Sequence, residues 1–492
     1  MSASGRTATV VGSGPNGLAA ALVLAEAGVS VTVVEAEDSP GGGVRSAELM
    51  HSGVIHDLCS AAHPLAQVSP FLRDPRFGPA LRHRGLRFAP APLDMVHIVS
   101  DDRAGVRSAA LHTSPAVTGE QLPGRDGRVW EASFGALSAR ADLIADEFLG
   151  PVLHLPRHPL LLAGFGAGAA LPASWSWRRW RSEEARALFA GIAAHAFTPL
   201  HLPASSAAGT LLTVAGHRHG WPVVVGGSRR IADTMVEELQ HRGGTTVTGS
   251  RVTDLSQVGD TDIVLLDTSV DTAAGILGGR LPGRTARAWS RFRHGPAVAK
   301  IDYVLDGDVP WTAPDAQCAG TVHLGGRAEE VAAAEKQCWA GTLPDRPFTL
   351  VGQQYLADPS RSRTTGGRTL NPLWAYSHVP AGWDGGTRDT FELVTAQIER
   401  AAPGFRDCVV DWVASPPSAV EEHNANYVDG DISGGANDLL QLVARPRLSP
   451  DPYSTGVPGV YLCSSSAAPG GGVHFMCGVR AAQRALRDLG DL

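Results

Sequence analysis

The chain has 492 residues, of which 43% are hydrophobic and 18% are charged, and its formal net charge is −7. This length exceeds one compact core, so we expect two or three domains of ordinary globular composition. The acidic balance offers no positive field, and we therefore expect no nucleic-acid partner. The six cysteines show no CxxC pair and no metal-ligand spacing, which predicts no metal site and a reducing, cytoplasmic compartment.

A strand–turn–helix pattern with three spaced glycines opens the chain. Residues 7–11 are β-rich, residues 18–27 are rich in Ala and Leu, and Gly12, Gly14 and Gly17 lie between them. Such glycines allow a sharp turn, close approach of a pyrophosphate to the backbone, and tight packing of helix on strand. The helix N-terminus adds free N–H groups and a favourable dipole. The pattern therefore predicts a dinucleotide site.

A second predicted strand, residues 31–34, ends at Glu35, whose carboxylate can accept hydrogen bonds from both ribose hydroxyls of a dinucleotide. The glycines at 41–43 permit a second close backbone approach, and Arg45 can reach a phosphate. The predicted cofactor contacts in this part of the chain are Val11, Gly12, Gly14, Pro15, Asn16, Gly17, Glu35, Ala36, Gly42, Gly43 and Arg45.

Residues 159–173 are apolar, but the run is short and is interrupted by Gly and Pro. No apolar run reaches the roughly 20 residues that a membrane-spanning helix needs. We expect this segment to line a pocket or a lid, and we expect no membrane contact. The first strand begins close to residue 1, so no signal peptide is expected.

A second α/β pattern begins at Trp221 and continues to a strand over residues 262–267. This pattern indicates that the chain returns to the nucleotide domain and extends its sheet. We expect the backbone of Val252 to contact adenine and Thr268 to lie near the cofactor. Residues 81–215 carry helical patterns, and residues 295–450 carry strand-like runs at 297–305, 348–356 and 373–379, followed by a helix at 390–401.

The C-terminal segment is again glycine-rich and precedes an amphipathic helix. The N-terminus of that helix, near residues 472–474, can face the N1–C2=O edge of an isoalloxazine and stabilise a reduced flavin. Glycine-rich segments at both ends of one chain together indicate FAD. The predicted contacts here are Ser465, Gly472, Val473 and His474.

These patterns predict an α/β protein with two domains. Residues 1–80, 216–294 and 451–492 are predicted to form a Rossmann-type FAD-binding domain of the glutathione reductase-like kind. Residues 81–215 and 295–450 are predicted to form an interrupted α+β substrate-binding domain, built on an antiparallel or mixed sheet that covers the flavin.

The ordered motifs resemble the phytoene desaturase-like branch of the FAD-dependent amine oxidase superfamily, and within it the branch labelled pyridine nucleotide-disulfide oxidoreductase domain-containing protein 2. The resemblance covers nearly the whole chain. The motifs that carry it are Gly53 with Asp57, His63-Pro64, Ser69-Pro70, Ala194-His195, Gly216 to Pro222, Gly226-Gly227, Asn424 to Asn426, Gly430 to Ile432, Arg445-Pro446, Leu462-Cys463 and Pro469 to His474.

Three residues depart from the family pattern close to the expected flavin: Ser464 replaces a usual Gly, Ala468 a frequent His, and Phe475 a small residue. These departures suggest an altered substrate pocket or a partly closed face of the ring. No redox Cys pair and no second GxGxxG unit are visible, so a disulfide-reductase activity is not expected.

The resemblance implies a flavoenzyme in which hydride moves from substrate carbon to flavin N5. Lys300, one of only two lysines in the chain, lies in a strand similar to the one whose lysine holds a water against N5 in amine oxidases. A compact ammonium can anchor a water, although a salt-bridged strand lysine is the alternative. His474 is the second catalytic candidate as a proton acceptor, although it can equally cap the last helix.

We therefore expect a FAD-dependent desaturase, dehydrogenase or oxidase of a small, mostly apolar metabolite. The alternatives are a flavin-dependent amine oxidase, a flavin-bound isomerase or cyclase without net redox, and a binding protein that kept the architecture. The electron acceptor (oxygen, a quinone or another carrier), the substrate, and the formation of a homodimer stay open.

Overall fold

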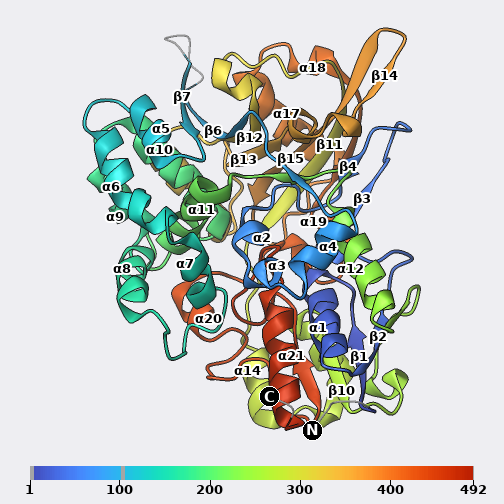
Figure 1. Ribbon diagram of the computed structural model, residues 1–492. Helices are drawn as coiled ribbons and strands as arrows, with labels where there is room; N and C mark the ends of the chain where they lie inside the picture. Colours follow the sequence, from blue (N-terminus) through green and yellow to red (C-terminus); the bar gives the residue numbers. More distant parts are fainter. Residues whose placement is uncertain (1–4, 101–105, 491–492) are drawn as a thin grey trace.

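The computed structural model describes residues 5–100 and 106–490. In Figure 1, a parallel sheet with the first and last helices forms the lower part of the molecule, a larger sheet forms the upper part, and a group of helices covers one side. The arrangement is the mixed α/β fold expected from the sequence.

Five parallel strands of the described chain form the lower sheet, in the order β17-β10-β1-β2-β9. Their bounds are β1 Thr7–Val11, β2 Ser30–Val34, β9 Thr245–Val247, β10 Ile263–Leu266 and β17 Val460–Leu462. Strands β10 and β17 are fully buried, as expected where both faces of a parallel sheet are covered, whereas the edge strand β9 is largely exposed. The sheet therefore joins segments from the start, the middle and the end of the chain.

The first and last helices, α1 (Pro15–Glu26) and α21 (Met476–Asp488), lie side by side on this sheet. Their close approach depends on Gly478, because a Cβ at that position would lie 1.8 Å from the carbonyl oxygen of Asn16. Helix α12 (Arg229–His241) packs on the other side of α1 and places its apolar residues toward the sheet, as its 3–4 spacing predicts.

The upper sheet is mixed, with eight strands in the described chain and the order β16-β11-β15-β13-β12-β6-β7, and with β14 paired to β15. Strands β12 and β6 are parallel, and the other pairs are antiparallel. The bounds are β6 Leu93–Ser100, β7 Arg107–Leu111, β11 Ala297–Asp306, β12 Ala319–Leu324, β13 Thr349–Gly352, β14 Arg363–Thr365, β15 Arg368–Val379 and β16 Val409–Ser415.

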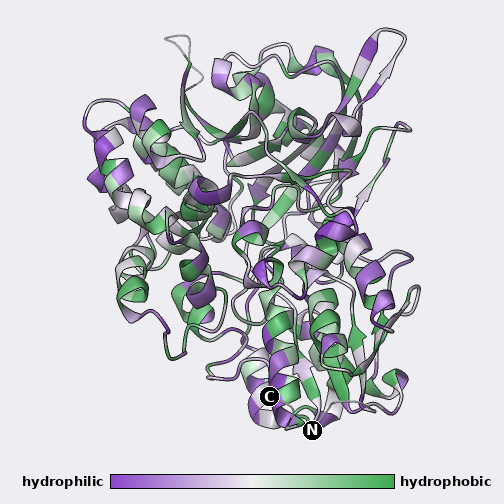
Figure 2. Ribbon diagram, in the orientation of Figure 1, coloured by the Kyte–Doolittle hydropathy of each residue, from purple (hydrophilic) through white to green (hydrophobic). Residues whose placement is uncertain are grey.

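The two faces of the upper sheet differ because side chains alternate along each strand. On β11, Ile301 and Tyr303 pack into a core that includes helix α17 (Thr387–Ala401). Lys300 and Asp302 point to the opposite face, which borders a cavity. Figure 2 shows the apolar strands at the centre of both sheets.

Helices α5 to α11 form the lateral group. Their bounds are α5 Pro115–Gln121, α6 Asp126–Ser138, α7 Ala141–Phe148, α8 Pro159–Ala169, α9 Ala173–Ser176, α10 Glu183–Ala193 and α11 Ser206–His219. The domain limits drawn from the sequence at 80/81 and 215/216 fall inside helices α4 (Gly78–His83) and α11. Within the described residues, no helix combines the length and apolarity needed to cross a bilayer.

Further strands and α-helices of the described chain accompany these parts. They are β3 Ser46–Ala47, β4 His56–Asp57, α2 Pro64–Val68, α3 Pro70–Arg73, β5 Phe88–Ala89, β8 Val223–Val224, α13 Val270–Leu277, α14 Gly283–Trp289, α15 Ala328–Trp339, α16 Gln354–Ala357, α18 Phe405–Cys408, α19 Pro417–His423 and α20 Leu439–Val443.

Candidate active site

A cavity of about 910 Å³ lies between the two sheets and reaches the lateral helices. Both glycine-rich segments contribute to its wall, as do Lys300 and Asp302 from the upper sheet. The predicted residues on this wall are Val11, Gly12, Gly14, Pro15, Asn16, Glu35, Ala36, Gly42, Gly43, Arg45, Val252, Thr268, Lys300, Ser465, Gly472, Val473 and His474. Gly17 is the one predicted contact that does not line the cavity.

The glycines of the first turn fit around one buried side chain, Asp267. Gly12 adopts a φ of +100°, and a Cβ there would lie 2.6 Å from the carbonyl oxygen of Asp267. A Cβ on Gly14 would lie 2.6 Å from the Asp267 carboxylate, and the Gly17 N–H donates to that carboxylate at 2.9 Å. Gly17 therefore serves packing beneath the turn, because a Cβ there would also meet the Gly12 carbonyl at 2.3 Å.

Sequence reasoning did not select Asp267. The residue directly follows β10, and burial, reinforced by the nearby charge of Glu35, raises the pKa of its carboxyl to about 7 although two glycine N–H groups oppose the shift. A polar residue at the carboxyl end of a buried parallel strand, facing a Gly-rich turn, is the signal that could have identified it.

Glu35 stands at the end of β2 and is held by protein groups. Its Oε2 accepts hydrogen bonds from the Ser13 backbone N–H at 2.9 Å and from the Ser13 hydroxyl, and its Oε1 accepts from the Glu37 N–H at 2.9 Å. A carboxylate offers about four acceptor positions. One position therefore remains for a ligand hydroxyl, fewer than the two that the sequence suggested.

Arg45 follows the second glycine run and lines the cavity. Its Nε donates to the Gly42 carbonyl at 3.2 Å, and its Nη2 donates to the His423 carbonyl. Its Nη1 lies 3.9 Å from Glu37. The guanidinium is thus anchored by its own loop and by the end of α19, and its contact with a phosphate stays a prediction.

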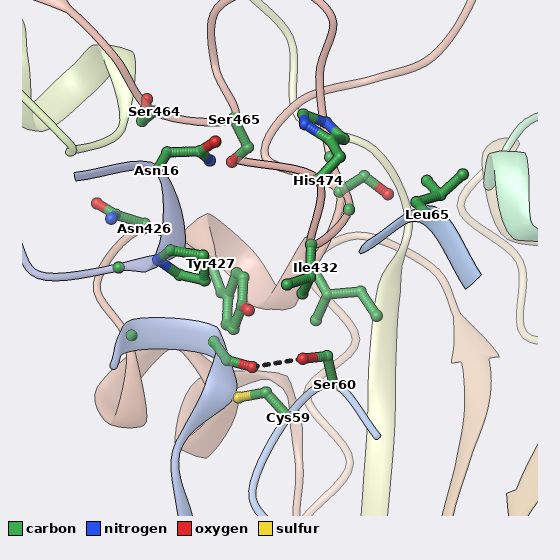
Figure 3. A pocket seen from close by; sticks show the side chains of 18 of the residues that line it. Asn16, Cys59, Ser60, Leu65, Asn426, Tyr427, Ile432, Ser464, Ser465 and His474 are labelled. Carbon is green, nitrogen blue, oxygen red and sulfur yellow. Dashed lines mark hydrogen bonds between the residues drawn. The ribbon is translucent and has the colours of Figure 1, made fainter. Parts of the chain in front are cut away.

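The C-terminal segment lies beside the start of α1 on the cavity wall. Figure 3 shows Asn16, Ser465 and His474 along one side of the pocket, and Cys59 and Tyr427 along the other. The Asn16 side-chain oxygen is buried and has no hydrogen-bond partner. A buried amide oxygen of this kind is expected to pair with a ligand or an ordered water.

The surroundings of His474 do not favour the predicted role of catalytic proton acceptor, which stays a prediction. Its Nδ1 accepts the backbone N–H of Met476 at 3.1 Å, which leaves its Nε2–H to donate to the Gly470 carbonyl at 3.1 Å. Burial lowers the pKa of the ring to about 4. With both nitrogens engaged by backbone, His474 caps the first turn of α21, which was the alternative role.

Two of the three departures from the family pattern lie on the cavity wall. Ser464 and Ala468 line it, as expected for an altered pocket. Phe475 does not, because it is fully buried and packs on Phe71 with ring centroids 5.1 Å apart. It therefore does not close a face of the cavity.

Lys300 is buried and forms an ion pair with Asp302, two residues along β11 on the same face. The ammonium also lies 5.9 Å from the centroid of the Trp374 ring. The second carboxylate oxygen of Asp302 is buried without a hydrogen-bond partner. The pair therefore offers ammonium hydrogens and a free acceptor to a water or a ligand in the cavity.

Aromatic rings continue the wall beside this pair. Trp374 and Tyr376 on β15 are edge-to-face at 5.0 Å, and Phe197 stacks near Tyr376 at 6.3 Å. The sequence did not identify such a group, because Phe197 and β15 are far apart along the chain.

The far end of the cavity is apolar. It is lined by residues of α8, as the sequence predicted for that segment, and by residues of α11 and α20: Leu162, Gly166, Ala169, Ala207, Ala208, Leu211, Leu212, Leu442 and Val443. The cavity therefore joins a polar, glycine-rich half to an apolar chamber.

Beneath the C-terminal segment lies Arg445, which the sequence marked only as part of a motif. It is 1% exposed and donates to the backbone carbonyls of Ser433 and Ser465, each at 2.9 Å. Its burial lowers the pKa of the guanidinium, and its bonds to carbonyls fix the loops that carry the cavity wall.

Comparison with known proteins supports this description. Residues 10–74 match the family described as NAD(P)-binding Rossmann-like domain. The chain is 26% identical to pyridine nucleotide-disulfide oxidoreductase domain-containing protein 2 of Rattus norvegicus, over 99% of this chain and 94% of that protein. These matches confirm the resemblance stated from the motifs.

Two solved structures share the fold along the whole chain. An oxidoreductase from Methanosarcina mazei superposes with a TM-score of 0.63 at 15% identity, covering 97% of this chain and 100% of that one. Wild-type putrescine oxidase bound to putrescine superposes with a TM-score of 0.60 at 19% identity, covering 99% of both chains. These structures confirm the fold class.

Proposed function

We propose that this chain, similar over its full length to those oxidoreductases, binds FAD in the glycine-rich half of its cavity and oxidises a mostly apolar small molecule in the other half. One observation carries the proposal: a single continuous cavity joins the two glycine-rich segments to the apolar chamber. The substrate-facing groups at the junction are Lys300 and Asp302.

The residues present fit a flavin dinucleotide. Gly14 and Gly42 lie where two loops meet, and a Cβ on Gly42 would lie 3.1 Å from the Gly14 Cα. Without side chains here, the backbone of both loops is accessible to a ligand. Glu35 keeps one acceptor position for a ribose hydroxyl, and the helix N-terminus of α1 favours the pyrophosphate. Asn16 offers its unpaired oxygen at the same end.

When bound, FAD supplies the hydride acceptor of the reaction. The protein contributes position and polarity. Lys300, fixed by Asp302, presents ammonium hydrogens that hold a water at the cavity wall, and the free oxygen of Asp302 accepts one of that water's hydrogens. The apolar side chains of α8 and α11 exclude bulk water and select an apolar substrate by burying its surface.

The first test is the colour of the purified protein. We expect a yellow protein whose released chromophore is FAD, with about one FAD per chain. Anaerobic addition of apolar alcohols, amines or alkenes should bleach the flavin absorbance for a true substrate. A colourless protein that cannot be reconstituted with FAD contradicts the proposal, and turnover without bleaching would indicate an isomerase instead.

The role of Lys300 has its own test. We expect Lys300→Met to slow flavin reduction or its reoxidation at least tenfold in stopped-flow measurements, because the variant cannot hold a water. Lys336→Met is the matched control, since Lys336 is the only other lysine and is exposed on α15. Unchanged rates in both half-reactions of Lys300→Met would remove this residue from the mechanism.

A flavin-dependent amine oxidase is the second candidate, and the wall of Phe197, Trp374 and Tyr376 favours it. These rings offer π-faces close to Lys300, a surface suited to an alkylamine. We expect Trp374→Leu to weaken binding of an alkylamine more than binding of the matched alcohol if the substrate is an amine. Equal losses would favour oxidation of a neutral substrate.

A further inference from the structure

Two histidines meet at the cavity wall, away from the Lys300–Asp302 pair. His195, in the short 3-10 helix Ala194–Ala196, is half-buried and lines the cavity. His323, on β12, is fully buried. Their Nε2 atoms lie 3.2 Å apart, which is hydrogen-bond distance. The ring of Trp221 packs edge-to-face against both imidazoles, at 5.3 and 6.0 Å, and holds the pair in place.

Both rings are neutral at neutral pH. Burial, with the nearby His378, lowers the pKa of His195 to about 3, and burial with the neighbouring imidazoles lowers the pKa of His323 well below its ordinary value. A neutral imidazole carries one N–H and one acceptor nitrogen. The shared hydrogen bond therefore has two arrangements, with either His195 or His323 as its donor.

The two arrangements present opposite groups to the cavity. When His195 donates from Nε2, its Nδ1 is an acceptor; when His323 donates, the His195 Nδ1 carries hydrogen and is a donor. The Nδ1 of His323 is buried without a hydrogen-bond partner in both arrangements, so His323 itself favours neither of them. The group that meets His195 in the cavity therefore decides between them.

From this geometry we infer that His195, positioned by His323, binds a hydroxyl or carbonyl group on an otherwise apolar substrate, accepting from the first and donating to the second. The inference deepens the proposed function and rests on it. Oxidation of a secondary alcohol passes hydride to the flavin, releases the hydroxyl proton to water and leaves a ketone. The substrate thus changes from donor to acceptor, and the histidine pair can follow that change.

Three eight-carbon probes test this subsite in the FAD-loaded protein: 2-octanol, 2-octanone and n-octane, with binding followed by tryptophan fluorescence. We expect His195→Phe to weaken both polar probes about fivefold to tenfold, the loss expected for one hydrogen bond, and to change n-octane less than twofold. The affinity of each probe is compared between the variant and the wild type, so differences in water solubility among the three probes do not affect the result.

The matched control is His97→Leu. His97 is another buried imidazole packed against His323, at 6.0 Å, but it does not line the cavity and its Nε2 is paired with the Gly326 carbonyl. We expect this variant to keep the wild-type ratio of polar to apolar affinity. An equal loss for all three probes in His195→Phe, or no binding of either polar probe by the wild type, overturns the subsite.

The tautomers give an independent readout that a structural role would not move. In ¹⁵N-histidine spectra, 2-octanol should favour Nε2–H on His195, and 2-octanone should favour Nδ1–H, with His323 changing in the opposite sense. The same tautomer with both probes would contradict the inference. A wild type that binds no FAD refutes the proposed function, and the probe and tautomer measurements are then repeated on the FAD-free protein. A wild type that binds FAD while His195→Phe loses all three probes equally refutes the subsite alone.

Discussion

At the scale of single residues, Asp267 shows how a cofactor turn can be built around an acid. The first glycine-rich turn wraps this carboxyl, which has no cation within ion-pair distance among the described residues, and two glycine N–H groups are its donors. A buried carboxyl without a counter-charge favours its neutral form. A neutral acid at this place also avoids repulsion with a bound pyrophosphate.

This arrangement predicts a pH dependence of stability. The pKa of Asp267 rises from an ordinary 3.8 to about 7 on folding, so the folded state binds the extra proton between these values. The stabilisation is complete below pH 4 and is lost as pH rises through 7, by on the order of 4 kcal/mol. Asp267→Asn should remove this slope, measured as the urea midpoint between pH 5 and 8.

The control for this experiment is Asp260→Asn, which removes an exposed carboxylate from the same segment and should keep the wild-type slope. A wild-type urea midpoint that rises from pH 5 to 8 would contradict the assignment of a protonated Asp267. So would a pH slope that persists unchanged in Asp267→Asn. The variant should also bind FAD with less dependence on pH than the wild type does.

The sequence identified the residues of the glycine-rich turns but did not indicate that both ring nitrogens of His474 pair with backbone groups. Spacing placed this histidine at a helix N-terminus beside a cavity, and the structure has it there. The φ of +70° at Phe475 turns the chain so that Met476 and Gly470 engage both ring nitrogens. A local backbone angle of this kind leaves no pattern in the sequence, so the loss of basicity could not be predicted.

At the scale of elements, alternation and helical periodicity within one segment were sufficient to predict that segment as a strand or a helix. The strand predicted at 297–305 is β11, Ala297–Asp306, and the helix predicted at 390–401 is α17, Thr387–Ala401. Helix α1 begins at Pro15, earlier than predicted, because proline suits the first helical position. The pairings His195–His323 and Phe197–Tyr376 join distant segments, and alternation or periodicity within one segment does not encode them.

The contact between α1 and α21 gives a prediction at this scale. Gly478→Ala places a methyl group against the Asn16 carbonyl, a backbone atom that cannot rotate away. We expect a loss of about 1–3 kcal/mol in the free energy of unfolding and weaker FAD binding, because Asn16 lines the cavity. Urea denaturation and a fluorescence titration with FAD measure the two effects.

Gly275→Ala is the matched control for this substitution. Gly275 lies inside helix α13 and a Cβ there meets nothing within 4 Å. Alanine should stabilise this helix by about 0.5–1 kcal/mol and leave FAD affinity unchanged. Equal effects of the two substitutions would show that the α1–α21 contact is looser than the structure has it.

At the scale of the whole molecule, a fully buried ion pair joins two segments that lie outside both large sheets. Asp57 lies on β4, which follows the second glycine run along the chain, and Arg361 ends the short 3-10 helix Pro359–Arg361 just before β14 of the upper sheet. The Asp57 carboxylate also accepts the backbone N–H of Ser228, at the start of α12, at 2.7 Å. Arg361 donates to the Val224 carbonyl at 2.6 Å and contacts Asp358. The cavity depends on this junction because the chain directly after β4 lines it.

Breaking the Asp57–Arg361 pair should therefore destabilise the protein. Arg361→Met leaves the Asp57 carboxylate buried without its counter-charge, and we expect a loss of about 3–5 kcal/mol in the free energy of unfolding. The double variant Asp57→Asn/Arg361→Met should lose less than the single one, because no unpaired charge remains. Disruption of the exposed pair Arg368–Asp306 by Arg368→Met is the control and should leave the free energy of unfolding nearly unchanged, because solvent screens this pair.

Acid provides a second measurement on the same pair. Burial alone would raise the pKa of Asp57, but the charge and hydrogen bond of Arg361 outweigh it and hold that pKa below its ordinary value of 3.8. Its contribution to stability is therefore present above the ordinary pKa and is lost as pH falls through the lower, folded one. On acidification of the wild type, FAD release and the change in tryptophan fluorescence that reports unfolding should occur at the same pH. In Arg361→Met, FAD release should occur at a higher pH than unfolding. Coincident transitions in this variant would show that the ion pair does not support the FAD-binding cavity.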